Sequence, residues 1–295
     1  MRRYWNLKKV LPNQKNQEVI QEFLTHLKLA NRTEGTIIVY RRFLEDFFGE
    51  VEESYDKLSS NQIIGWFHAN KKHLKDTSFK GKLNILSSFY SFCVQESLME
   101  RSPIKRRWFP RLTKTIPKAL GKEEIAKVIR EAERRPLRDQ AIVEFLLTSG
   151  CRIGELHLLN IGDLDLENRT ARVRGKGKKI RMVHFSEKCL ILLERYLETR
   201  LDINDSSPLF INSVENRIGI RSYFTIIATI GKLAGLSSNL HPHRFRHTFA
   251  TELLSKGADL SFISEELGHA DLKTTQVYAR VLNQSILAQY RKFMG

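Results

Sequence analysis

The chain is poor in cysteine and has no long apolar run, and both shortages exclude classes of protein. Its three cysteines, Cys93, Cys151 and Cys189, are odd in number and widely spaced, so we expect reduced thiols and neither a disulfide framework nor a zinc cluster. No segment approaches the ~20 apolar residues of a membrane span. No apolar core follows the basic N-terminus, so we expect no secretory signal and a cytoplasmic protein.

The signatures of nucleotide and metal chemistry are also missing. Gly175–Lys178 reads Gly-Lys-Gly-Lys, but its spacing is not that of a P-loop and a strand is predicted to follow it. No well-placed acidic triad indicates metal-dependent DDE transposition. His241, His243 and His247 have a spacing that zinc ligands can adopt, yet two intervening arginines would repel a cation. We therefore expect no metal and no cofactor.

Positive charge is what the chain has in excess. Lys and Arg number 49 against 33 Asp and Glu, which gives a formal net charge of +16. Because each neutralised phosphate releases counterions, this excess favours a polyanionic partner over a merely solvated basic surface. The densest basic stretch, between residues 101 and 118, contains no acid and holds Arg101, Lys105, Arg106, Arg107, Arg111, Lys114 and Lys118.

Three prolines interrupt that stretch and discourage a continuous helix. We interpret it as an extended interdomain linker that lies on phosphates, with an ordinary solvated linker as the alternative. The predicted domains are therefore an N-terminal domain of residues 1–104, a basic linker of residues 105–118, and a C-terminal domain of residues 119–295.

Apolar periodicity predicts mostly helix. The N-terminal domain shows four helical faces, at residues 19–27, 37–47, 63–67 and 83–94, and Ser59 or Ser60 could cap the third. These faces are aromatic and are expected to form a core. In the C-terminal domain, segments 170–174 and 179–185 predict a β-hairpin. Helices are predicted there at 122–132, 137–148, 187–201, 220–234, 245–255, 260–267 and 274–281, followed by a tail helix at 284–293.

Several side chains in the C-terminal domain suit chemistry on a phosphodiester. Arg152 and Arg246 offer planar guanidiniums that pair with phosphate oxygens. Histidine can move a proton near neutral pH, and Tyr278 becomes a nucleophile once cations stabilise its phenolate. A lysine on the hairpin tip could protonate a leaving oxygen.

One ambiguity stays open at this point. Pro242 in the first turn of a helix places His243 and Arg246 on one face, three residues apart. Arg244 and His247 have the same spacing in the other phase, so the residues alone do not choose between the two pairs.

Four motifs in this order resemble the tyrosine recombinase (phage integrase) family, most closely its small Xer-like and transposon-resolvase members. They are Ser149–Leu156, Arg174–Lys178, Pro242–Thr251 and Leu267–Tyr278. Residues 1–110 add only helical character and basic charge. The resemblance selects the pair His243 and Arg246. It implies a catalytic set of Arg152, Lys176, His243, Arg246, His269 and Tyr278.

By the same resemblance, the two arginines clamp the scissile phosphate and His269 adds a hydrogen bond. His243 accepts the proton of Tyr278, the nucleophile, and Lys176 protonates the departing 5′ oxygen, with Lys178 and Lys179 as substitutes. Glu155 supports its neighbours. Contacts with DNA are expected from Lys105, Arg106, Arg107, Arg111, Lys114, Lys178 and Lys179.

The implied fold is mostly α with a small antiparallel sheet: a SAM-like four-helix core-binding domain and a catalytic domain of the DNA breaking-rejoining fold form a C-shaped clamp on DNA. The implied activity is site-specific recombination through a 3′-phosphotyrosyl intermediate and a Holliday junction. Expected partners are double-stranded DNA with paired half-sites and further subunits of a tetramer. The tail helix would dock on a neighbouring subunit, or alternatively in cis.

Two other functions are compatible with the same residues. A type IB topoisomerase-like enzyme shares the chemistry but relaxes DNA as a monomer, and a catalytically silent regulator would bind DNA alone. Within recombination, dimer resolution, cointegrate resolution and mobile-element integration all remain open.

Overall fold

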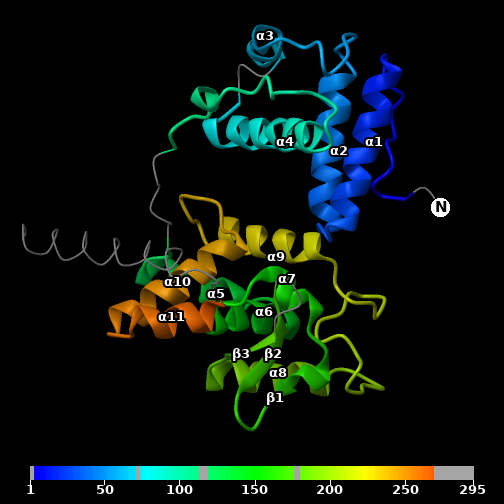
Figure 1. The fold of residues 1–295 in the computed structure, drawn as a ribbon. Coiled ribbons are helices and arrows are strands. Elements are labelled where there is room, and N and C mark those ends of the chain that lie inside the picture. The colour runs from blue at the N-terminus through cyan, green and yellow to red at the C-terminus, as the bar shows by residue number, and fades with distance from the viewer. Residues whose placement is uncertain (1–2, 71–73, 113–118, 176–179, 269–295) are drawn as a thin grey trace, which may run out of the picture. The chain divides into compact units, whose positions relative to one another are not determined.

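A computed structural model describes residues 3–70, 74–112, 119–175 and 180–268 (Figure 1). The chain divides into two compact units, residues 1–114 and residues 115–295, and the division falls inside the predicted linker. In the described ranges, every helix is too short or too polar to cross a membrane. The predicted helices at 274–281 and 284–293 lie outside these residues, as does the hairpin turn at 176–179.

The first unit contains the four predicted helices. Asn13 and Thr33 cap the first two, because each side chain accepts a hydrogen bond from the backbone N–H three residues on. At the third helix, Ser59 Oγ accepts from the Gln62 N–H at 3.3 Å, so Ser59 rather than Ser60 is the cap. The helices are α1 (Gln14–Leu29), α2 (Glu34–Phe48), α3 (Ser60–Asn70) and α4 (Asp76–Gln95).

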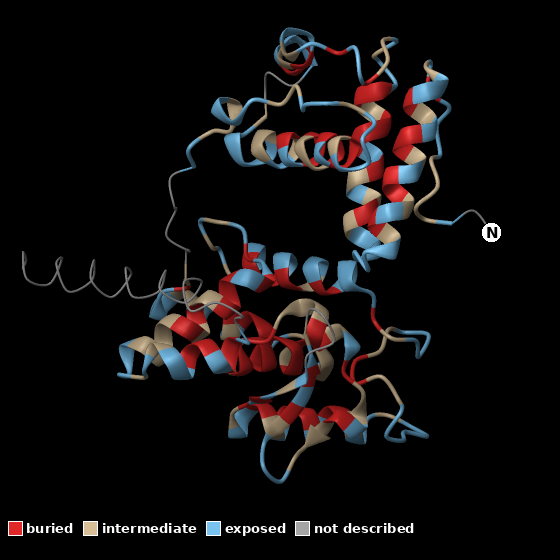
Figure 2. Cartoon of the chain, in the orientation of Figure 1, coloured by how far each residue is buried: buried red, intermediate tan, exposed pale blue. Residues whose placement is uncertain are grey.

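Aromatic side chains fill the core of this unit, as predicted, and Figure 2 shows the buried faces of its helices. The ring of Phe89 on α4 meets Phe23 and Phe48 at centroid distances of 5.5 Å, in both cases nearly edge to face. This is the arrangement that the quadrupoles of aromatic rings prefer. The rings are therefore core and not platforms for DNA bases.

The prediction of an extended chain from residue 101 onward is wrong for its first part. Arg106–Trp108 form a short 3₁₀ helix, η1. Ile104, Trp108 and Phe109, which flank the basic residues 105–107, pack against the core of the first unit. The segment up to Phe109 is thus docked on the helical unit. Its basic side chains at 105, 106 and 107 stay exposed, as does Arg111 just beyond it.

The second unit combines helices with one small antiparallel sheet. The predicted hairpin is confirmed, with Thr170 opposite His184 and Arg174 opposite Ile180, and a two-residue strand missed by the sequence completes the sheet. The elements are α5 (Lys122–Ala132), α6 (Leu137–Ser149), α7 (Ile153–Leu158), η2 (Ile161–Asp163), β1 (Leu164–Asp165), β2 (Thr170–Arg174), β3 (Ile180–His184), α8 (Glu187–Glu198), α9 (Ile220–Leu233), α10 (Pro242–Ser255) and α11 (Leu260–Leu267).

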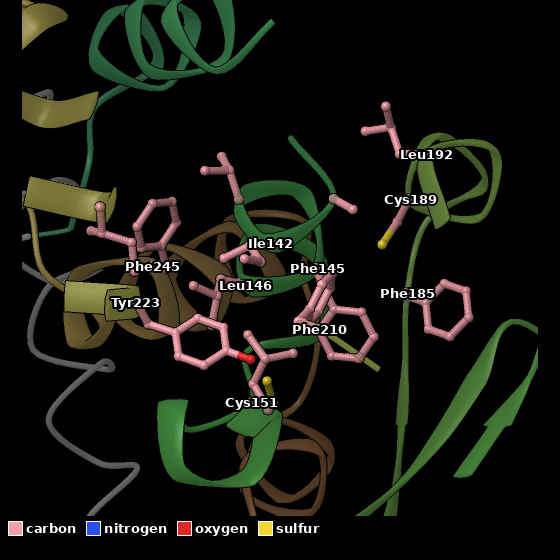
Figure 3. Packing of buried hydrophobic residues seen from close by; sticks show 14 of the residues in the cluster. Ile142, Phe145, Leu146, Cys151, Phe185, Cys189, Leu192, Phe210, Tyr223 and Phe245 are labelled. Atoms are coloured by element: carbon pink, nitrogen blue, oxygen red, sulfur yellow. The ribbon is translucent and has the colours of Figure 1, made fainter. Parts of the chain in front are cut away.

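Helix α6 is the centre of this unit. It packs against α5, α8 and α10, so apolar residues are buried around its whole circumference. Figure 3 shows Ile142, Phe145 and Leu146 surrounded by side chains from several other elements. The C-terminal end of α6 is therefore rigidly placed, and the next residues begin the candidate site.

Candidate active site

The turn between α6 and α7 places Arg152. Gly150 ends α6 with φ +58°, and a Cβ there would lie 2.3 Å from Cδ1 of Phe249. Only glycine satisfies both the left-handed backbone and this close ring. The chain therefore reverses sharply, and Arg152 becomes the N-cap residue of α7.

Glu155 holds Arg152 in place. Its carboxylate is buried; Oε2 accepts the Arg152 N–H at 2.7 Å and Oε1 accepts Nη1 of the same arginine at 2.8 Å. Arg181 on β3 reaches the same Oε1, with Nη1 at 3.0 Å. One buried carboxylate thus pairs with two guanidiniums, which compensates for its removal from water.

Arg246 lies on α10 and is almost fully buried, with 4% of the residue exposed. Its Nη1 donates to the carbonyl of Gly150 at 2.8 Å, and its Nη2 donates to the carbonyl of Leu267. These carbonyls end α6 and α11, where the helix dipoles favour a cation. Arg246 therefore ties two helix C-termini together.

Three arginines meet at the C-terminal end of α11. Arg181 Nε donates to the carbonyl of Glu266 at 3.1 Å, Arg246 to that of Leu267, and Arg152 Nη2 to that of Gly268 at 3.4 Å. Three consecutive carbonyl oxygens thus each accept from a different guanidinium. His269 follows directly in the sequence, outside the described residues.

A pocket of about 300 Å³ opens beside these arginines. Its walls come from the start of α7, the end of β2 and the start of α10. The lining residues are Cys151, Arg152, Ile153, Gly154, Glu155, Arg174, Gly175, Pro242, His243 and Arg246. Three members of the predicted catalytic set therefore face one volume, next to the strand end that leads toward Lys176.

The histidines on α10 are held in the neutral form. Desolvation, then the charges of Arg246 and Arg152, lower the pKa of His243 below its usual 6.5, although part of the residue is exposed. Burial, followed by the neighbouring His243, lowers the pKa of His247 to about 4. An imidazole at the pocket is thus available to accept a proton at neutral pH.

The zinc alternative finds no geometric support. Ring centroids lie 6.4 Å apart for His241 and His243, and 6.5 Å apart for His243 and His247. Among the described residues, no three His, Cys, Asp or Glu side chains gather in a way that could hold a metal ion. Cationic neighbours instead disfavour further positive charge here.

The structure decides between the two pairs that the sequence left open, His243 with Arg246 and Arg244 with His247. Arg244 is buried on the other side of α10, where Nη2 lies 3.0 Å from Oε2 of Glu124 and Nη1 donates to Ser238 Oγ at 3.0 Å. The pocket lining includes His243 and Arg246 and neither Arg244 nor His247.

Comparison with known proteins agrees with this geometry. The model of the phage integrase family matches residues 118–285, and the model of the phage integrase N-terminal SAM-like domain matches residues 20–97. The chain belongs to the phage integrase family. It is a tyrosine site-specific recombinase, as the motifs predicted, and the prediction of a SAM-like helical domain followed by a catalytic domain is confirmed.

Curated relatives cover nearly the whole recombinase. Tyrosine recombinase XerC of Thermodesulfovibrio yellowstonii is 35% identical over 288 residues, which are 94% of this chain and 96% of that protein. Tyrosine recombinase XerA of Pyrococcus horikoshii is 34% identical over 276 residues, 92% of each.

Solved structures show the same fold. A crystal structure of XerA recombinase is 29% identical, with a TM-score of 0.55 over 94% of this chain and 98% of that one. XerH recombinase bound to palindromic difH DNA in a post-cleavage complex reaches a TM-score of 0.74 at 22% identity, over 97% and 90%.

Other predicted site residues are distributed unevenly. Lys105, Arg106, Arg107 and Arg111 lie exposed on the first unit. Arg181, by contrast, was missed by sequence reasoning, because nothing local distinguishes it from the other basic residues of the hairpin. The residues Lys114, Lys176, Lys178, Lys179, His269 and Tyr278 lie outside the part of the chain that the structure describes.

Proposed function

We propose that this recombinase cuts and rejoins DNA through Tyr278, and that Arg152, His243 and Arg246 form the described part of the catalytic site. The observation that carries the proposal is the pocket that these three side chains share. Arg152 and Arg246 also hold the last carbonyls before His269. The last described residues before His269 therefore lie beside the proposed phosphate site.

The arginines supply the charge that phosphoryl transfer requires. Negative charge builds on the non-bridging oxygens in the transition state, and guanidiniums fixed in advance stabilise it without reorganising. Arg152 and Arg246 are fixed by hydrogen bonds to Glu155, Gly150 and Leu267. This pre-organisation supports their assignment as the phosphate clamp.

His243 is the proposed proton acceptor. Its pKa lies below 6.5, so it is neutral when it meets the phenol. Tyr278 Oη forms a bond to phosphorus and transfers its proton to His243. The bond from phosphorus to the 5′ oxygen breaks, and Lys176 gives that oxygen a proton while His269 hydrogen-bonds the phosphate.

The resulting 3′-phosphotyrosine keeps the energy of the broken bond. The 5′ hydroxyl of another strand attacks it, Tyr278 leaves with a proton, and the strand is sealed. Two successive exchanges, separated by a Holliday junction, complete recombination. The chemistry uses the protein's own groups for acid, base and nucleophile.

The proposed partners are double-stranded DNA with paired half-sites and other subunits of a tetramer. The charge of +16 supports a nucleic-acid partner. So do the exposed basic residues 105, 106 and 107 of the docked segment and Arg111 just beyond it. We also propose domains of residues 1–104 and 119–295 joined by the segment 105–118, whose first part docks on the helical domain, and a cytoplasmic location at the nucleoid.

A groove on the second unit suits the tail helix. It has a volume of about 490 Å³ and includes the apolar side chains Ile125, Ile129, Leu147, Phe249, Leu253 and Phe262. The tail from Gln284 carries Ile286, Leu287 and Tyr290 at helical spacing. We propose that the tail of a neighbouring subunit occupies this groove and joins subunits on DNA.

Xer-type resolution of chromosome dimers is the biological task we propose. The relatives reported above are named XerC and XerA, and they match the chain from end to end rather than over one domain. Cointegrate resolution and integration would use the same chemistry on other sites. The choice of target therefore distinguishes these tasks.

Mapping covalently trapped DNA tests the proposal. Nicked fragments of the host chromosome are incubated with the purified protein, and protein-linked DNA is collected under denaturing conditions and sequenced. We expect one dominant site with inverted half-sites, attached through a 3′ phosphate. Attachment spread over unrelated sequences would favour a topoisomerase, and absence of any linked DNA would refute the proposal.

A further inference from the structure

Arg181 touches two parts of the site without belonging to its predicted set. It lies on β3, and only 16% of its side chain is exposed. Nη1 pairs with Glu155 Oε1 at 3.0 Å, and Nε donates to the Glu266 carbonyl at 3.1 Å. One side chain therefore joins the sheet to the start of α7 and to the end of α11.

The backbone of α11 is shaped around this arginine. Gly268 has φ +60°, and a Cβ there would lie 2.8 Å from both Cδ and Nε of Arg181. Arg181 therefore packs directly against the main chain of the residue before His269. Its aliphatic stem and its guanidinium thus contact the backbone at Glu266 and Gly268, the last part of the chain that the structure describes before His269.

Stability alone does not account for this arrangement. Nη2 of Arg181 is buried and has no hydrogen-bond partner in the described structure, which opposes folding. Arg152 and Arg181 also place two positive charges on one oxygen of Glu155. Such an arrangement is retained more readily for the position that it imposes than for the stability that it gives.

We infer that Arg181 is a positioning residue for strand cleavage, acting through Arg152 and through the end of α11. By sharing Glu155, it limits the hold of that carboxylate on Arg152, so the Arg152 guanidinium keeps donors directed at the scissile phosphate. By holding Glu266 and packing on Gly268, it fixes the backbone that immediately precedes His269. This inference rests on the proposed function.

The test compares Arg181→Ala and Arg181→Lys with a matched control. Arg172→Ala removes an arginine from the neighbouring strand β2, where Nη2 lies 3.1 Å from the buried Asp163, and Arg172 does not line the pocket. Cleavage of a nicked suicide substrate is measured in a single turnover, together with DNA affinity and the thermal midpoint.

We expect Arg181→Ala to slow cleavage roughly 100-fold while DNA affinity changes little, because misplaced catalytic groups cost about that much. Arg181→Lys keeps the charge and one contact, so it should restore part of the rate. Arg172→Ala should cleave like the wild type. If the cleavage rate fell in proportion to the thermal midpoint in all three variants, the inference would be overturned.

A neutral scissile linkage supplies a readout that a structural role would not move. A methylphosphonate carries no negative charge, so it needs the Arg152 guanidinium less. The loss of cleavage rate caused by Arg181→Lys should therefore be smaller on this linkage. This variant can be used even if Arg181→Ala does not fold. An equal defect on both linkages would overturn the inference. If the wild-type protein cleaved neither the phosphodiester nor the methylphosphonate, the proposed function itself would be overturned.

Discussion

Arg244 and Glu124 form an ion pair that joins helices 120 residues apart in the sequence: Nη2 lies 3.0 Å from Oε2, and the arginine is buried. This pair fixes the rotation of α10 about its axis. Because α10 is held by Arg244 on one side, Arg246 lies on the side of Gly150 and the pocket. Arg244 therefore holds α10 in place, whereas Arg246 faces the pocket.

Arg244→Ala should reduce stability and leave the chemistry intact. Removing one partner of a mostly buried pair costs about 2 kcal/mol here, less than a fully buried pair because Glu124 is partly exposed. Arg246→Lys should instead abolish cleavage while the protein remains folded. Urea unfolding and suicide-substrate cleavage measure the two effects. A stable but inactive Arg244→Ala protein would contradict the assignment of Arg246 to the phosphate.

Tyr278→Phe should bind DNA normally and form no covalent complex. The substitution removes only the attacking oxygen, so the arginines and the DNA-binding surfaces are unchanged. Gel shift on an intact site and denaturing electrophoresis on a nicked suicide substrate check both halves. Tyr223→Phe is the matched control, because that ring is buried in the core of the same unit. Covalent product from Tyr278→Phe would exclude this residue as the nucleophile.

Histidine protonation should set the acid limit of the reaction. His243 acts as a base only when neutral, and its pKa is lowered below 6.5 by burial and by two arginines. The pH at which the single-turnover rate falls to half should therefore lie below 6.5. His243→Asn should remove this acid limb along with most of the rate. A rate that already halves near pH 7 would argue against a lowered pKa.

Stability should depend on pH through His247. Its folded pKa of about 4 lies below the unfolded value of 6.5, so the unfolded chain binds more protons between these values. The contribution of neutral His247 is fully present above pH 6.5 and is lost as pH falls toward 4. Urea unfolding at pH 7.5 and pH 5 should show this loss, and His247→Gln should reduce the difference. An unchanged difference would mean that other groups control it.

The basic segment docked on the first unit should bind phosphates without reading sequence. Replacing Arg106 and Arg107 with Ala should weaken DNA binding broadly and flatten its salt dependence by about one slope unit per lost phosphate contact. The control variant, Arg134→Ala with Lys188→Ala, removes equal charge from surface positions already paired with acids. An unchanged slope for the first variant would exclude the segment as a phosphate binder.

The helices and the hairpin were predictable because their signals are local. Apolar spacing marked α5 at Lys122–Ala132 to the residue, and Gly150 marked the end of α6. The two-residue strand β1 was missed because it is too short to show alternation. The docking of Trp108 could not be foreseen either, since its partners belong to a core assembled from distant residues.

The site divides in the same way. Residues within recognisable motifs, such as Arg152 and His243, could be named from the sequence. The face on which Arg246 lies depends on Glu124, far away in the chain, and the role of Arg181 depends on three elements meeting in space. Such relationships have no local signature, because tertiary packing alone creates them.

Docking of the tail in the groove of a neighbouring subunit can be tested at Phe262, which lines the groove and is 48% exposed. Phe262→Ser should leave binding of one subunit to a half-site intact and weaken the assembly of further subunits, because it removes apolar surface that the tail would cover. Native gel electrophoresis on full sites resolves the two steps.

The matched control is Phe224→Ser on α9, a residue with a similar exposed fraction, 43%, that does not line this groove. It should assemble like the wild type. Truncation after residue 283 should reproduce the Phe262→Ser defect, and combining both changes should add nothing further, since they remove two sides of one contact. If the tail docks in cis instead, either change should lower the thermal midpoint of the free protein and leave subunit assembly unaffected.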